Sequence, residues 1–154
     1  MISRRGWLRA SVASAAGLLV ASDRLLADAP VLPVITVYKD PSCGCCTKWV
    51  KHLSANGFVT MVRDTPDMDE IKRTMQVPAA LQSCHTAVVG AYVVEGHVPA
   101  GLIKKMLAEK AQIVGLAVPG MPNGAPGMET SGKADKYDVI AWERSGKTRV
   151  YASR

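Results

Sequence analysis

The 154-residue chain contains few aromatic residues and few cysteines, and both shortages limit what the protein can be. Aromatic side chains make up 5% of the sequence, and no run of basic residues is interleaved with them. The sequence therefore offers no typical nucleic-acid-binding surface, despite a formal charge of +6. Four cysteines are too few for a disulfide-rich scaffold, and a chain of this length buries a core without such bridges. We expect one domain with additional segments, and no nucleic acid as a partner.

Long hydrophobic runs and common catalytic motifs are also missing. The apolar stretch from Val12 to Ala21 is too short for a transmembrane helix, and no longer one follows. The sequence has no Gly-rich phosphate-binding loop and no Ser-His-Asp signature. The cysteines are therefore the side chains that best indicate a chemistry.

The N-terminus has the pattern of an export signal. A basic segment, SRRGWLR at residues 3–9, precedes the apolar stretch, and small residues then lead to Ala27-Asp28-Ala29. Two arginines followed by hydrophobic residues resemble a twin-arginine signal. We expect residues 1–29 to be a signal peptide, with its cleavage point open because Pro30 would hinder a cut after Ala29. The mature protein would then reside in the periplasm, an oxidising compartment where lasting thiols are catalytic or metal-bound.

The apolar periodicity predicts an α/β fold with a mixed sheet. Strands are expected at residues 34–38, 58–62, 86–90 and 91–95, and helices at residues 46–56, 67–75 and around 102–107. The first strand, helix and second strand form a parallel β-α-β unit, and the later strands form a hairpin. This order is thioredoxin-like, and we assign it to residues 30–112.

Residues 113–154 are expected to form a C-terminal extension of that domain. The stretch GLAVPGMPNGAPGME, residues 115–129, is rich in Gly and Pro and therefore predicts an irregular loop. Residues 137–142 and 148–152 predict a terminal hairpin that turns at Ser145-Gly146.

The segment PSCGCC, residues 41–46, places three cysteines in four positions. Cys43 and Cys46 have CxxC spacing at the start of a helix, where the helix dipole and free N–H groups favour a thiolate. Because a thiolate is both a nucleophile and a metal ligand, the pair suits disulfide exchange and metal binding equally. Cys45 favours a metal, since a dithiol enzyme needs only two cysteines. Adjacent thiolates diverge, so bridging several ions in a small cluster suits the three better than one ion.

Other candidate ligands lie further along the chain. In a thioredoxin-like fold, the loop that carries Cys84 and His85 faces the CxxC turn, so Cys84 should meet the other three cysteines. Met121 and Met128 lie in the Gly/Pro loop, and thioethers select soft ions, above all Cu(I). His97 lies on a turn beside the third helix and is a further candidate.

Alternatives remain open for each of these residues. The cysteines could hold zinc or be inert and buried, and the two loop methionines could simply pack on the core. Other methionines, Met61 and Met106 among them, have strand or helix spacing and are expected in the core. His52 is expected to be solvated on the exposed side of its helix.

Four motifs occur in order: YKDPSCGCC at residues 38–46, SCHTA at 83–87, VEGHVP at 94–99, and VPGMP with PGME at 118–122 and 126–129. From about Ile35 to Val139 the chain resembles the CopG-like proteins, exported bacterial proteins with a CxCC signature that are linked to copper resistance. The resemblance implies a thioredoxin-like domain, an extension that contributes to metal binding, and a cysteine-bridged cluster of several copper ions. It implies Cys43, Cys45 and Cys46 as cluster thiolates, with Cys84 as a further one. Met121, Met128, His85 and His97 occupy motif positions of the family.

Three functions follow as hypotheses. The first is a periplasmic copper-binding protein of copper tolerance that interconverts Cu(I) and Cu(II), as a copper oxidoreductase would. The second is a thiol–disulfide oxidoreductase in which Cys43 attacks and Cys46 resolves. The third is a non-catalytic carrier that hands copper to an efflux system or another periplasmic copper protein. A monomer is the simplest oligomeric state for all three.

Overall fold

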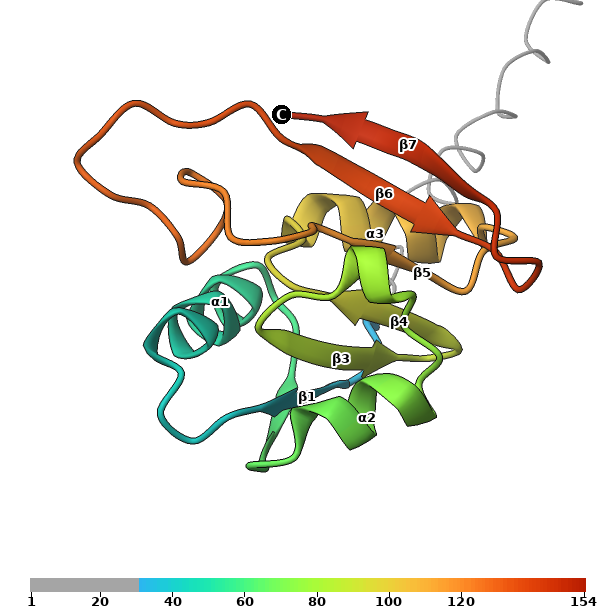
Figure 1. Cartoon of the computed structure of the whole chain (residues 1–154), viewed down its shortest axis with the longest axis horizontal. Helices are drawn as coiled ribbons and strands as arrows, with labels where there is room; N and C mark the ends of the chain where they lie inside the picture. Colours follow the sequence, from blue (N-terminus) through green and yellow to red (C-terminus); the bar gives the residue numbers. More distant parts are fainter. Residues whose placement is uncertain (1–30) are drawn as a thin grey trace, which may run out of the picture. The chain divides into compact units, whose positions relative to one another are not determined.

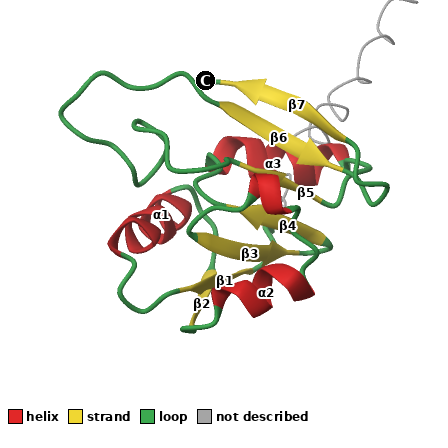
Figure 2. Ribbon diagram, in the orientation of Figure 1, coloured by secondary structure: helices red, strands yellow, loops and turns green. Residues whose placement is uncertain are grey.

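The computed structural model describes residues 31–154, so the expected signal peptide at residues 1–29 lies outside the described residues. The described chain has a mixed α/β fold in which three α-helices pack on one seven-stranded sheet (Figures 1 and 2). The strands are β1 (Ile35–Lys39), β2 (Thr60–Asp64), β3 (His85–Val89), β4 (Tyr92–Glu95), β5 (Gly115–Ala117), β6 (Asp138–Trp142) and β7 (Thr148–Ser153). The helices are α1 (Gly44–Ala55), α2 (Met68–Thr74) and α3 (Ala100–Glu109), with a short 3-10 turn at Ala79–Leu81.

The strand order across the sheet is β2-β1-β3-β4-β5-β6-β7. β1 pairs in parallel with β2, and β4 pairs in parallel with β5, whereas the other neighbours are antiparallel. The sheet is therefore mixed, as the sequence predicts. In Figure 1 the C-terminal strands β6 and β7 lie at one edge of this sheet, away from β1 and β2.

Neighbouring residues of one strand pack on opposite faces of the sheet, as the strand period of two requires. Val94 and Leu116 belong to a core cluster that includes Trp49 of α1 and Ile103 of α3. Their neighbours Val93 and Ala117 belong to a second cluster, built with Val77, Leu81 and Trp142. One face is thus covered by α1 and α3, and the other by α2 and the segment that follows it.

The structure differs from the expected elements in two places: the start of the helix that carries the CxCC cysteines, and the first residues of the Gly/Pro-rich segment. α1 begins at Gly44 rather than Cys46, because Cys43 is extended and serves as the N-cap residue. Gly115–Ala117, expected within an irregular loop, forms β5 between β4 and β6. Three residues are too few to show a strand period, so only the pairing with two neighbours reveals this strand.

Of the methionines expected in the core, one is buried in the structure and another is exposed. Met106 is fully buried in α3, as expected, but Met61 is 46% exposed on the edge strand β2, so that expectation was wrong. β2 has only one neighbouring strand, and most of its residues remain exposed. Among residues 31–154, no helix is both long and apolar enough to cross a bilayer.

Candidate metal centre

A tight turn after β1 delivers the CxCC cysteines. The Cys43 N–H donates to Asp40 O at 3.0 Å, and the Ser42 N–H donates to Asp40 Oδ1 at 2.8 Å. Pro41 occupies the second position of this turn, where its fixed φ favours the reversal. Cys43 then caps α1, and Cys45 and Cys46 lie in its first turn.

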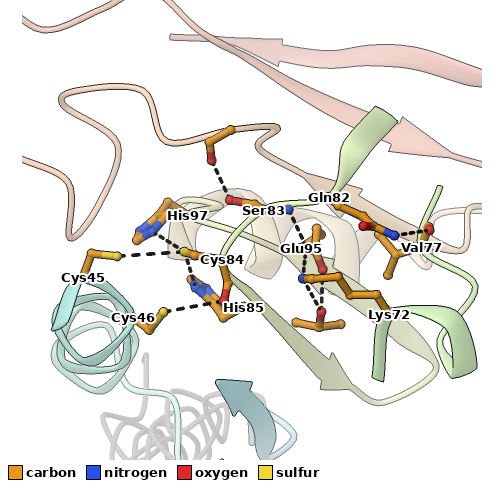
Figure 3. Close-up of polar contacts among 12 residues, drawn as sticks. Cys45, Cys46, Lys72, Val77, Gln82, Ser83, Cys84, His85, Glu95 and His97 are labelled. Carbon is orange, nitrogen blue, oxygen red and sulfur yellow. Dashed lines mark hydrogen bonds and ion pairs between the residues drawn. The ribbon is translucent and has the colours of Figure 1, made fainter. Parts of the chain in front are cut away.

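Antiparallel pairing of β1 and β3 brings the second cysteine segment to the same place. Lys39, the last residue of β1, is paired with His85, the first residue of β3. Cys84 immediately precedes β3, so it faces the start of α1. Cys45 Sγ lies 3.9 Å from Cys84 Sγ, and Cys46 Sγ lies 3.9 Å from Cys84 O (Figure 3).

The sulfur atoms of all four cysteines therefore gather in one cluster, within 4.8 Å of one another. Cys43 and Cys46 form a disulfide, whereas Cys45 and Cys84 are free thiols. Cys45 Sγ lies 3.5 Å from Cys43 Sγ. The cluster thus offers two thiols with the disulfide closed, and four once it is reduced.

Two histidines extend this cluster on the side of Cys84. Cys84 Sγ lies 3.3 Å from His85 Nδ1 and 3.1 Å from His97 Nε2. The ligand atoms of Cys84, His85 and His97 form a second donor group within 4.8 Å. Cys84 therefore belongs to both the four-sulfur group and the sulfur–imidazole group.

The tautomer of His97 follows from its surroundings. His97 Nδ1 lies 2.8 Å from Pro126 O, and a carbonyl oxygen only accepts hydrogen bonds. Nδ1 must therefore carry the proton and donate it, which leaves the Nε2 lone pair directed at Cys84 Sγ. Burial lowers the pKa of His97, which also favours the neutral ring. Outer contacts of this kind orient histidine ligands at metal sites.

His85 is fully buried beside the indole of Trp49. The ring centroids of His85 and Trp49 are 4.3 Å apart, and Trp49 Nε1 donates to Val98 O at 2.9 Å. His85 Nε2 is buried without a hydrogen-bond partner. Burial holds the pKa of His85 well below its usual range, with His97 and Lys72 acting in the same direction. A neutral imidazole can bind a metal through a ring nitrogen, and Nδ1 is the one that lies beside Cys84 Sγ.

The metal-free site keeps Cys84 protonated. Burial raises the pKa of the Cys84 thiol to about 12, and the neighbouring Cys45 acts in the same direction. A cation that binds here must displace that proton, which couples metal binding to proton release. Soft thiolate and imidazole donors suit Cu(I), Cu(II) or Zn(II) better than Mg²⁺ or Ca²⁺.

The Gly/Pro loop between β5 and β6 packs over this centre, beside α1 (Figure 1). A Cβ at Gly127 would lie 2.8 Å from Trp49 N and 3.0 Å from Cys45 O, so the loop touches the helix backbone here. Met128 follows directly and is half-buried, whereas Met121 is 57% exposed. The structure therefore distinguishes the two loop methionines that the sequence treats alike.

His52, which was expected to be exposed to solvent, is not. It is half-buried, and its Nε2 accepts a hydrogen bond from the Ala100 N–H at the start of α3, at 3.1 Å. The expectation was wrong because the sequence pattern of α1 does not show that α3 begins against its side. Sequence reasoning also missed that Trp49 contacts His85, since a buried tryptophan on a helix face indicates only packing.

Comparisons with known proteins support a copper-related assignment. The family profile described as "Protein of unknown function, DUF411" matches residues 81–128, which contain Cys84, both candidate histidines and both loop methionines. Two solved chains named "Copper resistance protein copG", Form 2 and Form 1, are each 47% identical to this chain. Each match covers 80% of this chain and 98% of the solved chain, with TM-scores of 0.76 and 0.75. This chain belongs to the CopG-like family.

Membership of the CopG-like family agrees with the CxCC segment and the donor groups around Cys84. A search of curated proteins found no match. The relatives and the cysteine cluster together indicate a copper-related role and a site able to hold metal ions.

Proposed function

We propose that this chain is a periplasmic protein of copper tolerance that holds copper in a cysteine-bridged cluster and interconverts Cu(I) and Cu(II). The cluster thiolates are Cys43, Cys45, Cys46 and Cys84. His85 and His97 complete the coordination. Of the two loop methionines, the half-buried Met128 is a better candidate for a copper ligand than the more exposed Met121. Copper is the cargo of this site, and the two named relatives are copper resistance proteins.

One observation carries the proposal: Cys84 Sγ is common to a group of four sulfurs and a group with two imidazoles. Thiolates favour Cu(I), whereas imidazole also tolerates Cu(II). A sulfur that bridges the two groups would let copper change oxidation state with little movement of its ligands. Zinc also binds mixed cysteine and histidine sets but keeps one oxidation state, so the copper resistance relatives favour copper over zinc here.

The cysteines can also supply the electrons for this interconversion. Oxidation of the Cys43 and Cys46 thiols to their disulfide releases two electrons and two protons. Two Cu(II) ions accept one electron each and become two Cu(I) ions. The disulfide in the structure corresponds to the product side of this reaction, with Cys45, Cys84 and the histidines still assembled.

The same proposal includes the organisation of the chain. Residues 1–29 direct export, residues 30–112 form a thioredoxin-like domain, and residues 113–154 extend it and contribute to the metal site. The hydrogen bond from His97 to Pro126 O and the contact of Gly127 with α1 support a contribution of the extension. A monomer would pass copper to an efflux system or to another periplasmic copper protein.

The decisive experiment is an anaerobic Cu(I) titration of the fully reduced mature protein against a competing chelator. Copper and reactive thiols are counted at the endpoint. We expect several tightly bound Cu(I) ions per chain and protection of all four thiols. Weak binding that leaves the thiols reactive would contradict the proposal, and a parallel titration with Zn²⁺ measures the preference between the two metals.

A second experiment follows the oxidation state. Cu(II) is added anaerobically to the reduced metal-free protein, and Cu(I) and disulfides are counted. We expect two Cu(I) ions for each Cys43–Cys46 disulfide formed. Copper that binds without any change of oxidation state would instead identify a non-catalytic carrier.

The Cys43–Cys46 disulfide also favours a second candidate, a thiol–disulfide oxidoreductase. In that function Cys43 attacks a substrate disulfide and Cys46 resolves the mixed disulfide. Insulin reduction by the metal-free protein tests it, with Cys45→Ser as the discriminating variant. The oxidoreductase keeps its activity in Cys45→Ser, whereas the copper cluster loses bound copper.

A further inference from the structure

A buried polar network lies beside the metal centre, and the chemistry described above does not use it. Glu95, the last residue of β4, is fully buried and forms an ion pair with Lys72 of α2, which is also buried. Thr86 Oγ1 accepts a hydrogen bond from Lys72 Nζ at 3.1 Å and donates one to Glu95 Oε2 at 2.6 Å. These three side chains form a closed ring of contacts. Figure 3 shows Lys72 and Glu95 to one side of the cysteines.

The Glu95 carboxylate also reaches the other side of the cysteine segment. The backbone N–H of Ser83 donates to Glu95 Oε1 at 2.6 Å. Ser83 precedes Cys84, and Thr86 follows His85, so one carboxylate binds the chain immediately before and immediately after the Cys84–His85 pair. Each end of this two-residue segment is therefore fixed to β4.

The strand that carries Glu95 leads directly to the other histidine. Gly96 follows, and its N–H donates to His85 O at 2.9 Å. A Cβ at Gly96 would lie 2.6 Å from Ser83 Oγ and 2.7 Å from Val118 O, so only a glycine fits between the Ser83 side chain and the backbone of Val118. His97 comes next. Glu95 thus joins the segment holding Cys84 and His85 to the strand that places His97.

Packing alone does not explain this arrangement. Removing two opposite charges from water is costly, and replacing a buried ion pair by apolar side chains is often neutral or stabilising. Burial raises the pKa of Glu95, while Lys72 and the hydrogen bonds act in the opposite direction. A fully hydrogen-bonded carboxylate does, however, fix backbone positions that an apolar side chain leaves free.

We propose that Glu95, held by Lys72 and Thr86, is a positioning residue that sets the spacing of Cys84, His85 and His97 for copper. This inference rests on the proposed function, because it takes those three residues as copper ligands. Among the described residues, the Glu95 carboxylate hydrogen-bonds to Lys72, Thr86 and Ser83 N and to none of those three side chains, so it acts through its neighbours and the backbone of β4. Loss of such outer contacts typically weakens metal affinity by about 10–100-fold.

The test separates positioning from stability with a paired replacement. Lys72→Met combined with Glu95→Leu removes both charges and leaves no unpaired buried ion, so the fold should keep a melting temperature close to that of the wild type. Its matched control is Lys105→Met with Glu109→Leu, which removes the exposed ion pair of α3. Cu(I) affinity by chelator competition and the sulfur-to-copper charge-transfer spectrum are measured well below every melting temperature.

We expect the Lys72/Glu95 variant to bind copper about 10–100-fold more weakly than the wild type, with a shifted spectrum. The Lys105/Glu109 control should match the wild type in both. A folded Lys72/Glu95 variant with wild-type affinity and spectrum would overturn the positioning role while leaving the copper function intact. A wild-type chain that binds no copper would overturn both.

Thr86→Val gives a second route should the paired variant fail to fold. Valine has nearly the shape of threonine but lacks the hydroxyl that links Lys72 to Glu95. We expect a loss of copper affinity of about tenfold, the lower end of the same range, in a folded protein. An unchanged affinity and spectrum in Thr86→Val would contradict the inference.

Discussion

Cys84 Sγ lies 3.1 Å from His97 Nε2, although the two residues come from different strand ends. Pro126 O fixes the His97 proton on Nδ1, so the Nε2 lone pair is available at Cys84. This relationship joins the cysteine cluster, β4 and the C-terminal loop at one sulfur atom.

Replacement of Cys84 should damage the copper site more than replacement of any outer residue, because both donor groups contain its sulfur. We expect Cys84→Ser to weaken Cu(I) binding by more than the roughly 10–100-fold typical of an outer-shell change. Copper stoichiometry after chelator competition measures this. In the wild type, copper binding should also release the Cys84 proton, since its pKa of about 12 keeps the metal-free thiol protonated. Unchanged stoichiometry in Cys84→Ser would remove this residue from the site.

The two loop methionines should respond differently to substitution. Met128 is half-buried beside Gly127, whereas Met121 is 57% exposed. Leucine nearly conserves the volume of methionine and typically costs less than about 1.5 kcal/mol of stability. We therefore expect Met128→Leu to lower Cu(I) affinity and Met121→Leu to leave it nearly unchanged. Equal effects in a chelator competition would show that exposure does not separate their roles.

Gly127→Ala should displace the loop from α1. Gly127 has φ +86°, and an added Cβ would lie 2.8 Å from Trp49 N, which is backbone and cannot swing aside. The matched control is Gly120→Ala, because Gly120 has φ +67° and nothing within 4 Å of a new Cβ. Both variants bear backbone strain of about 1–3 kcal/mol, but only Gly127→Ala adds the clash. We expect a larger fall in the free energy of unfolding and weaker copper binding for Gly127→Ala, measured by denaturant titration and chelator competition.

Stability of the metal-free protein should fall as the solution becomes acidic. Burial lowers the pKa of His52, with Glu129 acting in the opposite direction, so the unfolded chain binds a proton at a higher pH than the folded chain. The neutral His52 side chain therefore contributes fully to folding stability above its unfolded-state pKa of about 6.5. This contribution is lost as the pH falls below that value. His52→Gln removes this titration, so its free energy of unfolding should fall less than that of the wild type between about pH 7 and pH 5. Parallel slopes of the two proteins would contradict the expectation.

The sequence predicted the main elements because their signals are local. Apolar runs and turn residues gave β1, β3, β4 and the three helices to within a few residues. β5 was missed because three residues carry no period, and Met61 was misplaced because the sequence does not show that β2 is an edge strand.

In the candidate site, too, some features follow from the local sequence and others depend on tertiary contacts. Cys43, Cys45 and Cys46 stay within one turn because few bonds separate them, but adjacent side chains diverge, so the separations of their sulfurs came from the structure. The partners of Glu95 were not predictable, because Ser83, Thr86 and Lys72 reach it from a loop, a strand and a helix. Glu95 lies in a motif that stands out in the sequence, but nothing local indicates that its side chain is buried.

The sequence by itself determined the chemistry of this protein: a soft-donor CxCC segment, a Cys-His pair, and a loop that carries thioethers. The meeting of Cys84 with the other cysteines was predicted through the thioredoxin-like order, but only the tertiary structure decided that His97 joins them, because β3 and β4 set His97 against Cys84. Strand register is a cooperative property of the whole sheet. It therefore cannot be read from any one segment, however distinctive its residues are.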